Sequence, residues 1–189
     1  MGPHAMKVCI VSFSGRPAGN CSRIAEIIRQ TWQMKGEAVV YDFSAFRITP
    51  CGQCSYACFQ KREACPYFSD PEAAVCEEIT RSDLTYFIVP NYCDYPCANF
   101  YIFNERGQCF FQHHEDLLNQ YLAVRKKFIV VSNTNQDHFT AAFRYHIPEN
   151  TTPDILFLSA KQFGKVSIHG DLTDSEDVKR ILSDFIDKI

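Results

Sequence analysis

The stretch that decides the fold is V-C-I-V-S-F-S-G-R-P-A-G-N-C-S, residues 8–22. Its first four residues form an apolar run that predicts a buried strand, and the amphipathic segment that follows predicts a helix. Between them lies a loop in which Gly15 and Gly19 let the backbone approach a ligand closely. A strand, such a loop and a helix start direct free N–H groups and the positive end of the helix dipole at one point. The stretch therefore predicts either an anion-binding loop or an ordinary strand-to-helix connection capped by Asn20.

Polar side chains in the same loop suit a phosphate group. Ser14 and Ser22 offer hydroxyl donors, and Arg16 offers a positive charge. The first N–H groups of the helix that follows have no partner within the helix, so they are available to the same anion. The candidate phosphate-binding residues are Ser14, Arg16, Asn20, Cys21 and Ser22.

Strand and helix signals alternate along the rest of the chain. Strands are predicted at 7–13, 38–43, 84–90, 127–132 and 154–159, and helices at 21–35, 71–82, 97–106, 114–123, 136–146 and from Asp174 or Ser175 onward. Nearly all-apolar strands separated by helices imply a parallel sheet covered on both faces. We predict a single α/β domain over residues 6–189, a doubly wound sheet of five parallel strands with helices on both faces. Residues 1–5 are expected to be an expression scar before a native Met6.

Ligands of such folds bind beyond the C-terminal ends of the strands, where the winding of the chain reverses direction. That rule selects the loops at 13–22, 90–97 and 132–138. The third loop is polar and directly follows a strand, so it is a candidate wall of the ligand site. Its candidate residues are Ser132, Asn133 and Thr134.

Composition and charge exclude several classes of protein. The chain has 189 residues, a hydrophobic content of 46% and a net charge of -3, with a pI of about 6.1. This charge gives no electrostatic case for binding nucleic acid or an anionic membrane. No apolar run approaches the roughly 20 residues that span a bilayer, and the N-terminus lacks the apolar core of a secretion signal. We therefore expect a cytoplasmic protein with no nucleic-acid or membrane partner.

The ten cysteines are the unusual feature of the composition. Without a secretion signal, reduced thiols or ligands of a metal or cluster fit better than disulfides. Four of them have the spacing C-x2-C-x3-C-x6-C, with Pro66 after the last, and thiolates at such spacing can bind iron or zinc. An iron–sulfur cluster, a zinc site and a structured loop with free or redox-paired thiols all remain open. The candidate ligands are Cys51, Cys54, Cys58 and Cys65.

Two segments resemble the NADPH-dependent FMN reductase family. The first loop is similar to the family's S-x-R-x-x-x-N-T phosphate loop, with Cys21 in place of threonine. Residues 90–106, P-N-Y-C-D-Y-P-C-A-N-F-Y-I-F-N-E-R, are similar to the family segment P-x-Y-W-x-x-x-S-x-x-x-K-x-F-[ID]-D-R. Pro90, Tyr92, Phe103 and Arg106 match it, whereas Cys93, Cys97, Tyr101 and Glu105 stand in place of tryptophan, serine, lysine and aspartate.

This resemblance implies a flavodoxin-like fold and an enzyme with FMN, which would pass electrons from NAD(P)H or a protein electron donor to a flavin, quinone or similar small-molecule acceptor. The alternative is a non-catalytic carrier of the iron–sulfur flavoprotein type, with FMN and a [4Fe–4S] cluster. In either case the four cysteines are expected near the flavin edge. The aromatic residues at 95–111 and the Cys-rich loop also predict a homodimer or higher oligomer. The residues expected against the flavin in the second loop are Pro90, Asn91, Tyr92, Cys93 and Asp94.

Overall fold

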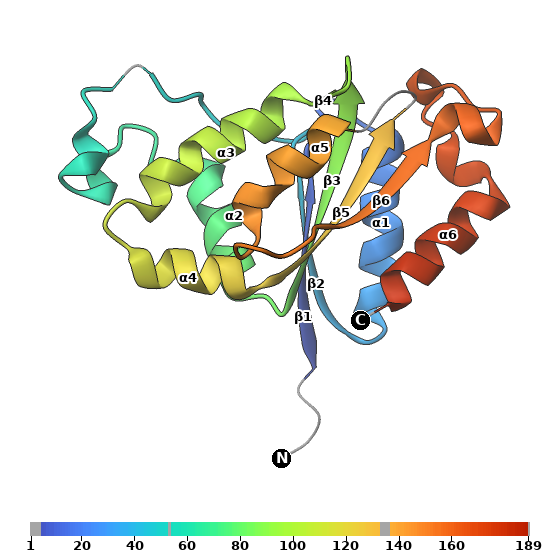
Figure 1. Cartoon of the computed structure of the whole chain (residues 1–189), viewed down its shortest axis with the longest axis horizontal. Helices are drawn as coiled ribbons and strands as arrows, with labels where there is room; N and C mark the ends of the chain where they lie inside the picture. The colour runs from blue at the N-terminus through green and yellow to red at the C-terminus, as the bar shows by residue number, and fades with distance from the viewer. Residues whose placement is uncertain (1–4, 53, 133–136, 189) are drawn as a thin grey trace.

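The computed structural model describes residues 5–52, 54–132 and 137–188, and its centre is a parallel sheet (Figure 1). The strands are β1 (Met6–Ser12), β2 (Gly36–Asp42), β3 (Leu84–Tyr92), β4 (Tyr95–Pro96), β5 (Arg125–Ser132) and β6 (Asp154–Ser159). They lie in the order β2-β1-β3-β5-β6, and β4 pairs with β3 in the antiparallel direction. Apart from β4, this is the strand order of doubly wound flavodoxin-like sheets. The predicted fold and its parallel strands are confirmed, and β4 is an addition that the sequence did not predict.

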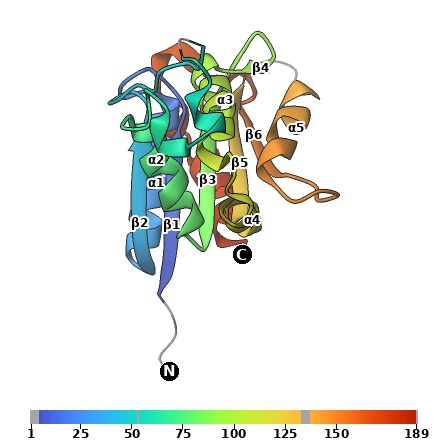
Figure 2. The same ribbon diagram turned by 90° about the vertical axis from the view of Figure 1, so that its left-hand side faces the viewer.

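Apolar side chains on both faces of the sheet explain why its strands are nearly continuous apolar runs. In β1, Val8 and Ile10 pack into one core, whereas Cys9 and Val11 pack into the other. Successive side chains of a strand point to opposite faces, so each buried strand supplies both cores. Helices α1 (Asn20–Gln33) and α6 (Glu176–Asp187) pack on the first core, and α2 (Pro71–Thr80), α3 (Ala98–Phe111), α4 (Glu115–Ala123) and α5 (Asp137–Phe143) pack on the second (Figures 1 and 2).

The helices agree with the sequence except at their ends. The helix predicted at 97–106 continues to Phe111, because Cys109 and Phe110 are buried by neighbouring elements. The helix predicted at 136–146 is α5 followed by a short turn of 3-10 helix. Within the described ranges, no helix is long and apolar enough to cross a membrane. Short 3-10 turns occur at Ala57–Phe59, Arg62–Ala64, Arg144–His146, Ala160–Phe163, Ser167–His169 and Leu172–Asp174.

Residues 44–70 form the Cys-rich excursion between β2 and α2. Arg106 of α3 makes hydrogen bonds to residues near both ends of this segment. The Arg106 guanidinium donates to Asp70 Oδ2 at 2.6 Å, to the Thr49 carbonyl at 2.9 Å and to the Tyr67 carbonyl at 3.0 Å. The Arg106 side chain is buried, so these partners offset a charge that would otherwise be costly to bury. Arg106 is therefore a structural residue that ties the excursion to α3.

Candidate functional site

The first loop places backbone donors at the C-terminal end of β1. Gly19 is the N-cap of α1, so the interpretation in which Asn20 caps this helix is wrong. The first N–H groups of α1, those of Asn20, Cys21 and Ser22, have no partner within the helix. No acidic residue in the first turn offsets the helix dipole. This end of α1 therefore presents free N–H donors and the positive end of the helix dipole, which is the local arrangement that the loop sequence predicts.

Two side chains of the loop add to this anion-attracting end. Ser14 is buried, and its Oγ accepts a hydrogen bond from the Arg16 N–H at 3.2 Å, so the hydroxyl proton remains to be donated. Arg16 Nη2 donates to the Ile168 carbonyl at 2.5 Å. A guanidinium carries five N–H donors, so Arg16 is anchored by this bond and keeps other donors for a ligand.

Residues 163–172, which the sequence did not predict to be part of the site, cross the first loop. Asn20 Nδ2 donates to the Ser167 carbonyl at 3.0 Å, and Asn20 Oδ1 accepts from the Leu172 N–H at 3.0 Å. Gly170 has a φ of 71°, and a Cβ there would lie 3.3 Å from a carbonyl oxygen of the first loop. Gly170 therefore permits a close crossing, and the Asn20 side chain holds the crossing segment in place.

The second loop is a tight hairpin between β3 and β4. Tyr92 pairs with Tyr95, and Cys93 and Asp94 between them have φ angles of 53° and 67°. Positive φ at both central residues is typical of a type I′ turn, which asparagine and glycine usually occupy. Residues with a Cβ store strain in this conformation, and such strain is found at functional sites. The turn leaves Tyr92 53% exposed beside the first loop.

The two loops and the crossing segment surround one cavity of about 290 Å³. It lies at the C-terminal ends of β1 and β3, where the winding of the sheet reverses direction. Its volume is near the lower end of the range for small-molecule sites. Of the predicted residues, Ser14, Arg16, Asn20, Cys21, Pro90, Asn91, Tyr92 and Cys93 line it, as does Gly19 of the first loop. Val131, Ser167 and Ile168 also line it and were not predicted.

The other predicted binding residues do not reach the cavity wall or lie outside the description. The Ser22 hydroxyl is buried and has no hydrogen-bond partner in the described part of the chain. Asp94 sits in the hairpin turn and does not line the cavity. Strand β5 ends at Ser132, whose side chain is outside the description, and Asn133 and Thr134 lie outside the described residues.

Buried thiols stand where the family resemblance expects hydroxyl groups. Cys97 Sγ donates to the Phe13 carbonyl at 3.3 Å, and Asn99 Nδ2 donates to the same oxygen at 3.0 Å. Burial raises the pKa of the Cys97 thiol to about 11 and raises the pKa of Cys21 well above its usual range, so both thiols are neutral at pH 7. Cys97 and Asn99 thus fix the first loop to the start of α3 without adding charge.

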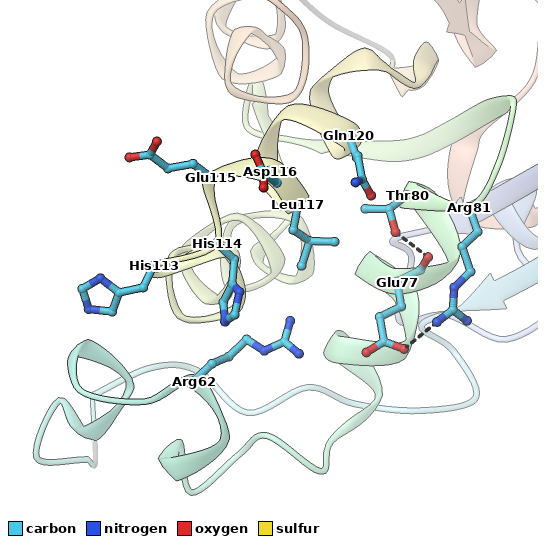
Figure 3. Close-up of a pocket in the computed structure, with 10 residues that line it drawn as sticks. All are labelled: Arg62, Glu77, Thr80, Arg81, His113, His114, Glu115, Asp116, Leu117 and Gln120. Atoms are coloured by element: carbon cyan, nitrogen blue, oxygen red, sulfur yellow. Dashed lines mark hydrogen bonds and ion pairs between the residues drawn. The ribbon is translucent and has the colours of Figure 1, made fainter.

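A larger hollow of about 840 Å³ lies between the C-terminal end of α2 and the start of α4 (Figure 3). Glu77 and Arg81 pair with each other there at 3.6 Å, and His113 and His114 are exposed at its other side. Because α2 leads directly into β3, this hollow lies toward the N-terminal ends of the strands. Its place and its mixed charges make it a poor site for a cofactor of a doubly wound sheet.

The predicted four-cysteine site is only partly assembled. Cys58 Sγ lies 3.5 Å from Cys109 Sγ, and Cys51 Sγ lies 3.9 Å from the same atom. Cys65 packs on this cluster, but no three His, Cys, Asp or Glu side chains in the described ranges are placed to hold a metal ion. Cys109 lies about 18 Å along α3 from the Cys97 end, given the rise of a helix. The sulfur cluster therefore packs on the opposite end of α3 from Cys97, whereas the four cysteines were expected near the edge formed by the first two loops.

No family model matches the sequence, and no curated protein matches it. Solved structures do match it. RosB with bound 8-demethyl-8-formylriboflavin-5′-phosphate has a TM-score of 0.61 at 12% identity, over 95% of this chain and 81% of that one. FerB from Paracoccus denitrificans, a flavoenzyme NAD(P)H:(acceptor) oxidoreductase, has a TM-score of 0.57 at 12% identity, and the match covers 96% of this chain and 93% of FerB. The Trp repressor binding protein from Bacillus subtilis has a TM-score of 0.59 at 14% identity, and the match covers 97% of this chain and 99% of that protein. At these identities the likeness shows a shared fold, which the strand order identifies as flavodoxin-like.

Proposed function

We propose that this chain is an FMN-dependent oxidoreductase that passes electrons from NAD(P)H or another reduced donor to a flavin, a quinone or a similar acceptor. The observation behind the proposal is the cavity between the first loop, the β3–β4 hairpin and residues 163–172. It joins an anion-attracting helix end to an exposed aromatic rim at the C-terminal edge of the sheet. That combination suits a ligand with a phosphate at one end and a flat ring at the other.

The first loop supplies the groups that would hold the phosphate of FMN. The free N–H groups at the start of α1 and the Ser14 hydroxyl are donors, and Arg16 adds positive charge. Among the described residues that line the cavity, no carboxylate would repel a phosphate dianion. Hydrogen bonds to a charged group contribute about 1.5–3 kcal/mol each, so a few such bonds suffice for stable binding.

The β3–β4 hairpin and Tyr92 provide the surface for the flavin ring. Bound FMN supplies hydride acceptance from a nicotinamide and electron release singly or in pairs. Beside the hairpin, Tyr95 stacks on His138 of α5, with ring centroids 4.2 Å apart and planes inclined by 8°. This stack extends the aromatic surface beyond the cavity. We propose that the donor and the acceptor approach at this rim.

Similar structures support the proposal through the chemistry that their descriptions name. RosB binds a derivative of riboflavin-5′-phosphate, and FerB is a flavoenzyme NAD(P)H:(acceptor) oxidoreductase. The cavity of this chain has hydrogen-bond donors for such a phosphate and an exposed rim where NAD(P)H could approach. We therefore propose a flavin phosphate and NAD(P)H as the first ligands to test with this chain.

FMN is the redox cofactor of this proposal, without an iron–sulfur cluster. The described side chains place Cys109, rather than Cys65, at the centre of the sulfur cluster, and they form no three-ligand metal site. Analysis of anaerobically prepared protein for iron and acid-labile sulfide separates the two cases. We expect neither, and about four of each per chain would favour the alternative of an electron carrier with a [4Fe–4S] cluster.

We also propose that the chain works as a homodimer through the aromatic surface of residues 95–111. Tyr95 and Tyr101 are 47% and 41% exposed there. Exposed aromatic side chains gathered in one region are typical of protein interfaces. Sedimentation velocity at tens of micromolar protein should give the mass of a dimer, and a sharp monomer boundary would refute this part.

Reconstitution tests the proposed enzyme. Flavin-free protein is titrated with FMN by flavin fluorescence, and the complex is assayed for NAD(P)H oxidation with a quinone or free flavin as acceptor. We expect saturable FMN binding and acceptor-dependent oxidation. Ser14→Ala should raise the Kd about tenfold or more because it removes a donor to a charged group. Gln30→Ala, an exposed change on α1, is the matched control and should not change the Kd.

Two results would contradict the proposal in different ways. Protein that binds no FMN has no cofactor site of the kind proposed. Protein that binds FMN but oxidises no reduced nicotinamide with any acceptor is a carrier or a binding protein rather than the proposed enzyme. In that second case the FMN Kd of Ser14→Ala still tests whether the first loop holds the phosphate.

A further inference from the structure

Cys51, Cys58 and Cys109 form a short chain of sulfur atoms on the Cys-rich excursion and α3. Cys109 Sγ is the middle atom, 3.5 Å from Cys58 Sγ and 3.9 Å from Cys51 Sγ. Cys58 and Cys109 are only 2% and 6% exposed, whereas Cys51 is partly exposed. Of these three sulfurs, Cys51 is therefore the one most accessible to a reagent in solution.

This arrangement suits a bond between sulfurs better than a metal centre. A structural zinc ion needs four ligands around one point, and the described residues offer no set of three. A disulfide needs only two sulfurs, which are about 2.05 Å apart when bonded. Closing the 3.5 Å gap between Cys58 and Cys109 takes a shift of about 1.5 Å, which side-chain rotation can largely provide.

The closest pair joins two elements that are far apart in the sequence. Cys58 lies in the 3-10 turn Ala57–Phe59 of the excursion, and Cys109 lies on α3. One turn earlier on α3, Arg106 already holds the excursion through its ion pair with Asp70. The reduced protein thus keeps both sulfurs in place, and a bond between them would lock a contact that already exists.

We propose that Cys58 and Cys109 form a reversible disulfide by exchange with low-molecular-weight disulfides, with Cys51 as the entry thiol. The Cys51 thiolate attacks one sulfur of the external disulfide, breaks its S–S bond and releases one thiolate. Cys109 then attacks the Cys51 sulfur and releases the second external thiolate. Cys58 attacks Cys109, which returns Cys51 to its thiol. Two protein thiols are oxidised, the external disulfide is reduced to two thiols, and these take the protons of Cys58 and Cys109.

Peptide mapping of the wild-type protein tests this directly. Reduced protein is incubated with oxidised glutathione, the remaining thiols are alkylated, and the protein is digested with trypsin without reduction. Trypsin leaves the first three cysteines of the excursion in peptide 48–61 and Cys109 in peptide 107–125. We expect a cross-link between these peptides that fragmentation assigns to Cys58. A link within peptide 48–61, glutathione adducts alone, or no reaction would overturn the proposal.

Serine variants separate the roles of the thiols. Cys109→Ser should abolish the cross-link, and Cys51→Ser should slow its formation at least about tenfold because the buried pair loses its entry thiol. Cys54→Ser removes another partly exposed thiol of the same peptide, which interacts with Cys51, and should leave the position of the cross-link unchanged. If Cys51→Ser forms the cross-link at the wild-type rate, Cys51 is not the entry thiol. Zinc that copurifies with the protein and blocks the reaction would contradict the proposed disulfide. FMN titration of the same samples is a separate measurement, so failure of one proposal does not decide the other.

Discussion

Replacing Asn20 by alanine tests how the binding cavity is built. The Asn20 side chain joins the first loop to residues 163–172 through two hydrogen bonds of 3.0 Å. Alanine removes both bonds and is a better helix former than asparagine. A loss of stability would therefore report the loss of the side-chain bonds rather than a weaker α1.

The two hydrogen bonds differ in their expected contribution. The Leu172 N–H is buried, and a buried donor left without an acceptor costs about 1–3 kcal/mol. Ser167 is partly exposed, so water can reach its carbonyl, and this bond contributes about 0.5–1.5 kcal/mol. Together they predict that Asn20→Ala lowers the free energy of unfolding by roughly 2–4 kcal/mol.

Urea denaturation measures this loss. We expect a lower midpoint with an unchanged m value, because the same surface is exposed on unfolding. The folded variant should also bind FMN about tenfold more weakly, because residues 163–172 supply Ser167 and Ile168 to the cavity wall. Gln30→Ala is the control and should stay within about 0.5 kcal/mol of wild type. A loss of less than about 0.5 kcal/mol in Asn20→Ala, or unchanged FMN affinity, would refute this role.

Three further predictions concern stability. Arg106→Met should lower the free energy of unfolding, measured in urea, by about 3–5 kcal/mol, because it leaves the Asp70 carboxylate without its buried partner. It should not change FMN affinity, and weaker FMN binding by the folded variant would contradict a purely structural role. Asp94→Gly should raise the free energy of unfolding by about 0.5–1 kcal/mol, because glycine relieves the positive φ; a loss in the same urea assay would show that the aspartate side chain is needed. Burial raises the pKa of Glu72 to about 7, although Arg106 lies 3.7 Å away, so the folded state holds this proton more tightly than the unfolded state. The stability that the protonated carboxyl contributes should be lost as the pH rises from about 4.5 to about 7. The difference in free energy of unfolding between wild type and Glu72→Gln should therefore shrink across that window. A difference that stays constant with pH in urea denaturation would contradict this.

The sheet and its first two loops could be predicted because their signals are local. The apolar run at 8–11 and the glycines of the first loop lie within the residues that form the strand and the turn. The placement of both loops at one edge then follows from the parallel direction of β1 and β3. Sequence therefore predicted most of the residues that line the cavity.

Features that depend on contacts between distant segments could not be predicted. Gly164 and Gly170 mark turns, but nothing near them in the sequence shows that residues 163–172 cross the first loop. Cys109 is far along the chain from the other cysteines of its cluster, so the spacing of neighbouring cysteines could not reveal it. Helix α3 passes its predicted end because the excursion and α4 bury its last turn, a tertiary effect that overrides local propensity.

Comparing FMN with riboflavin tests most directly whether the first loop binds the phosphate of a flavin. The two ligands share the ring and the ribityl chain, and only FMN has the phosphate. Flavin-free protein is titrated with each by fluorescence at fixed ionic strength. We predict that FMN binds at least about 100-fold more tightly, because two or more hydrogen bonds to the phosphate contribute about 1.5–3 kcal/mol each, and that Ser14→Ala weakens FMN binding alone. Equal affinity for the two flavins, or no binding of either, would contradict the proposed site.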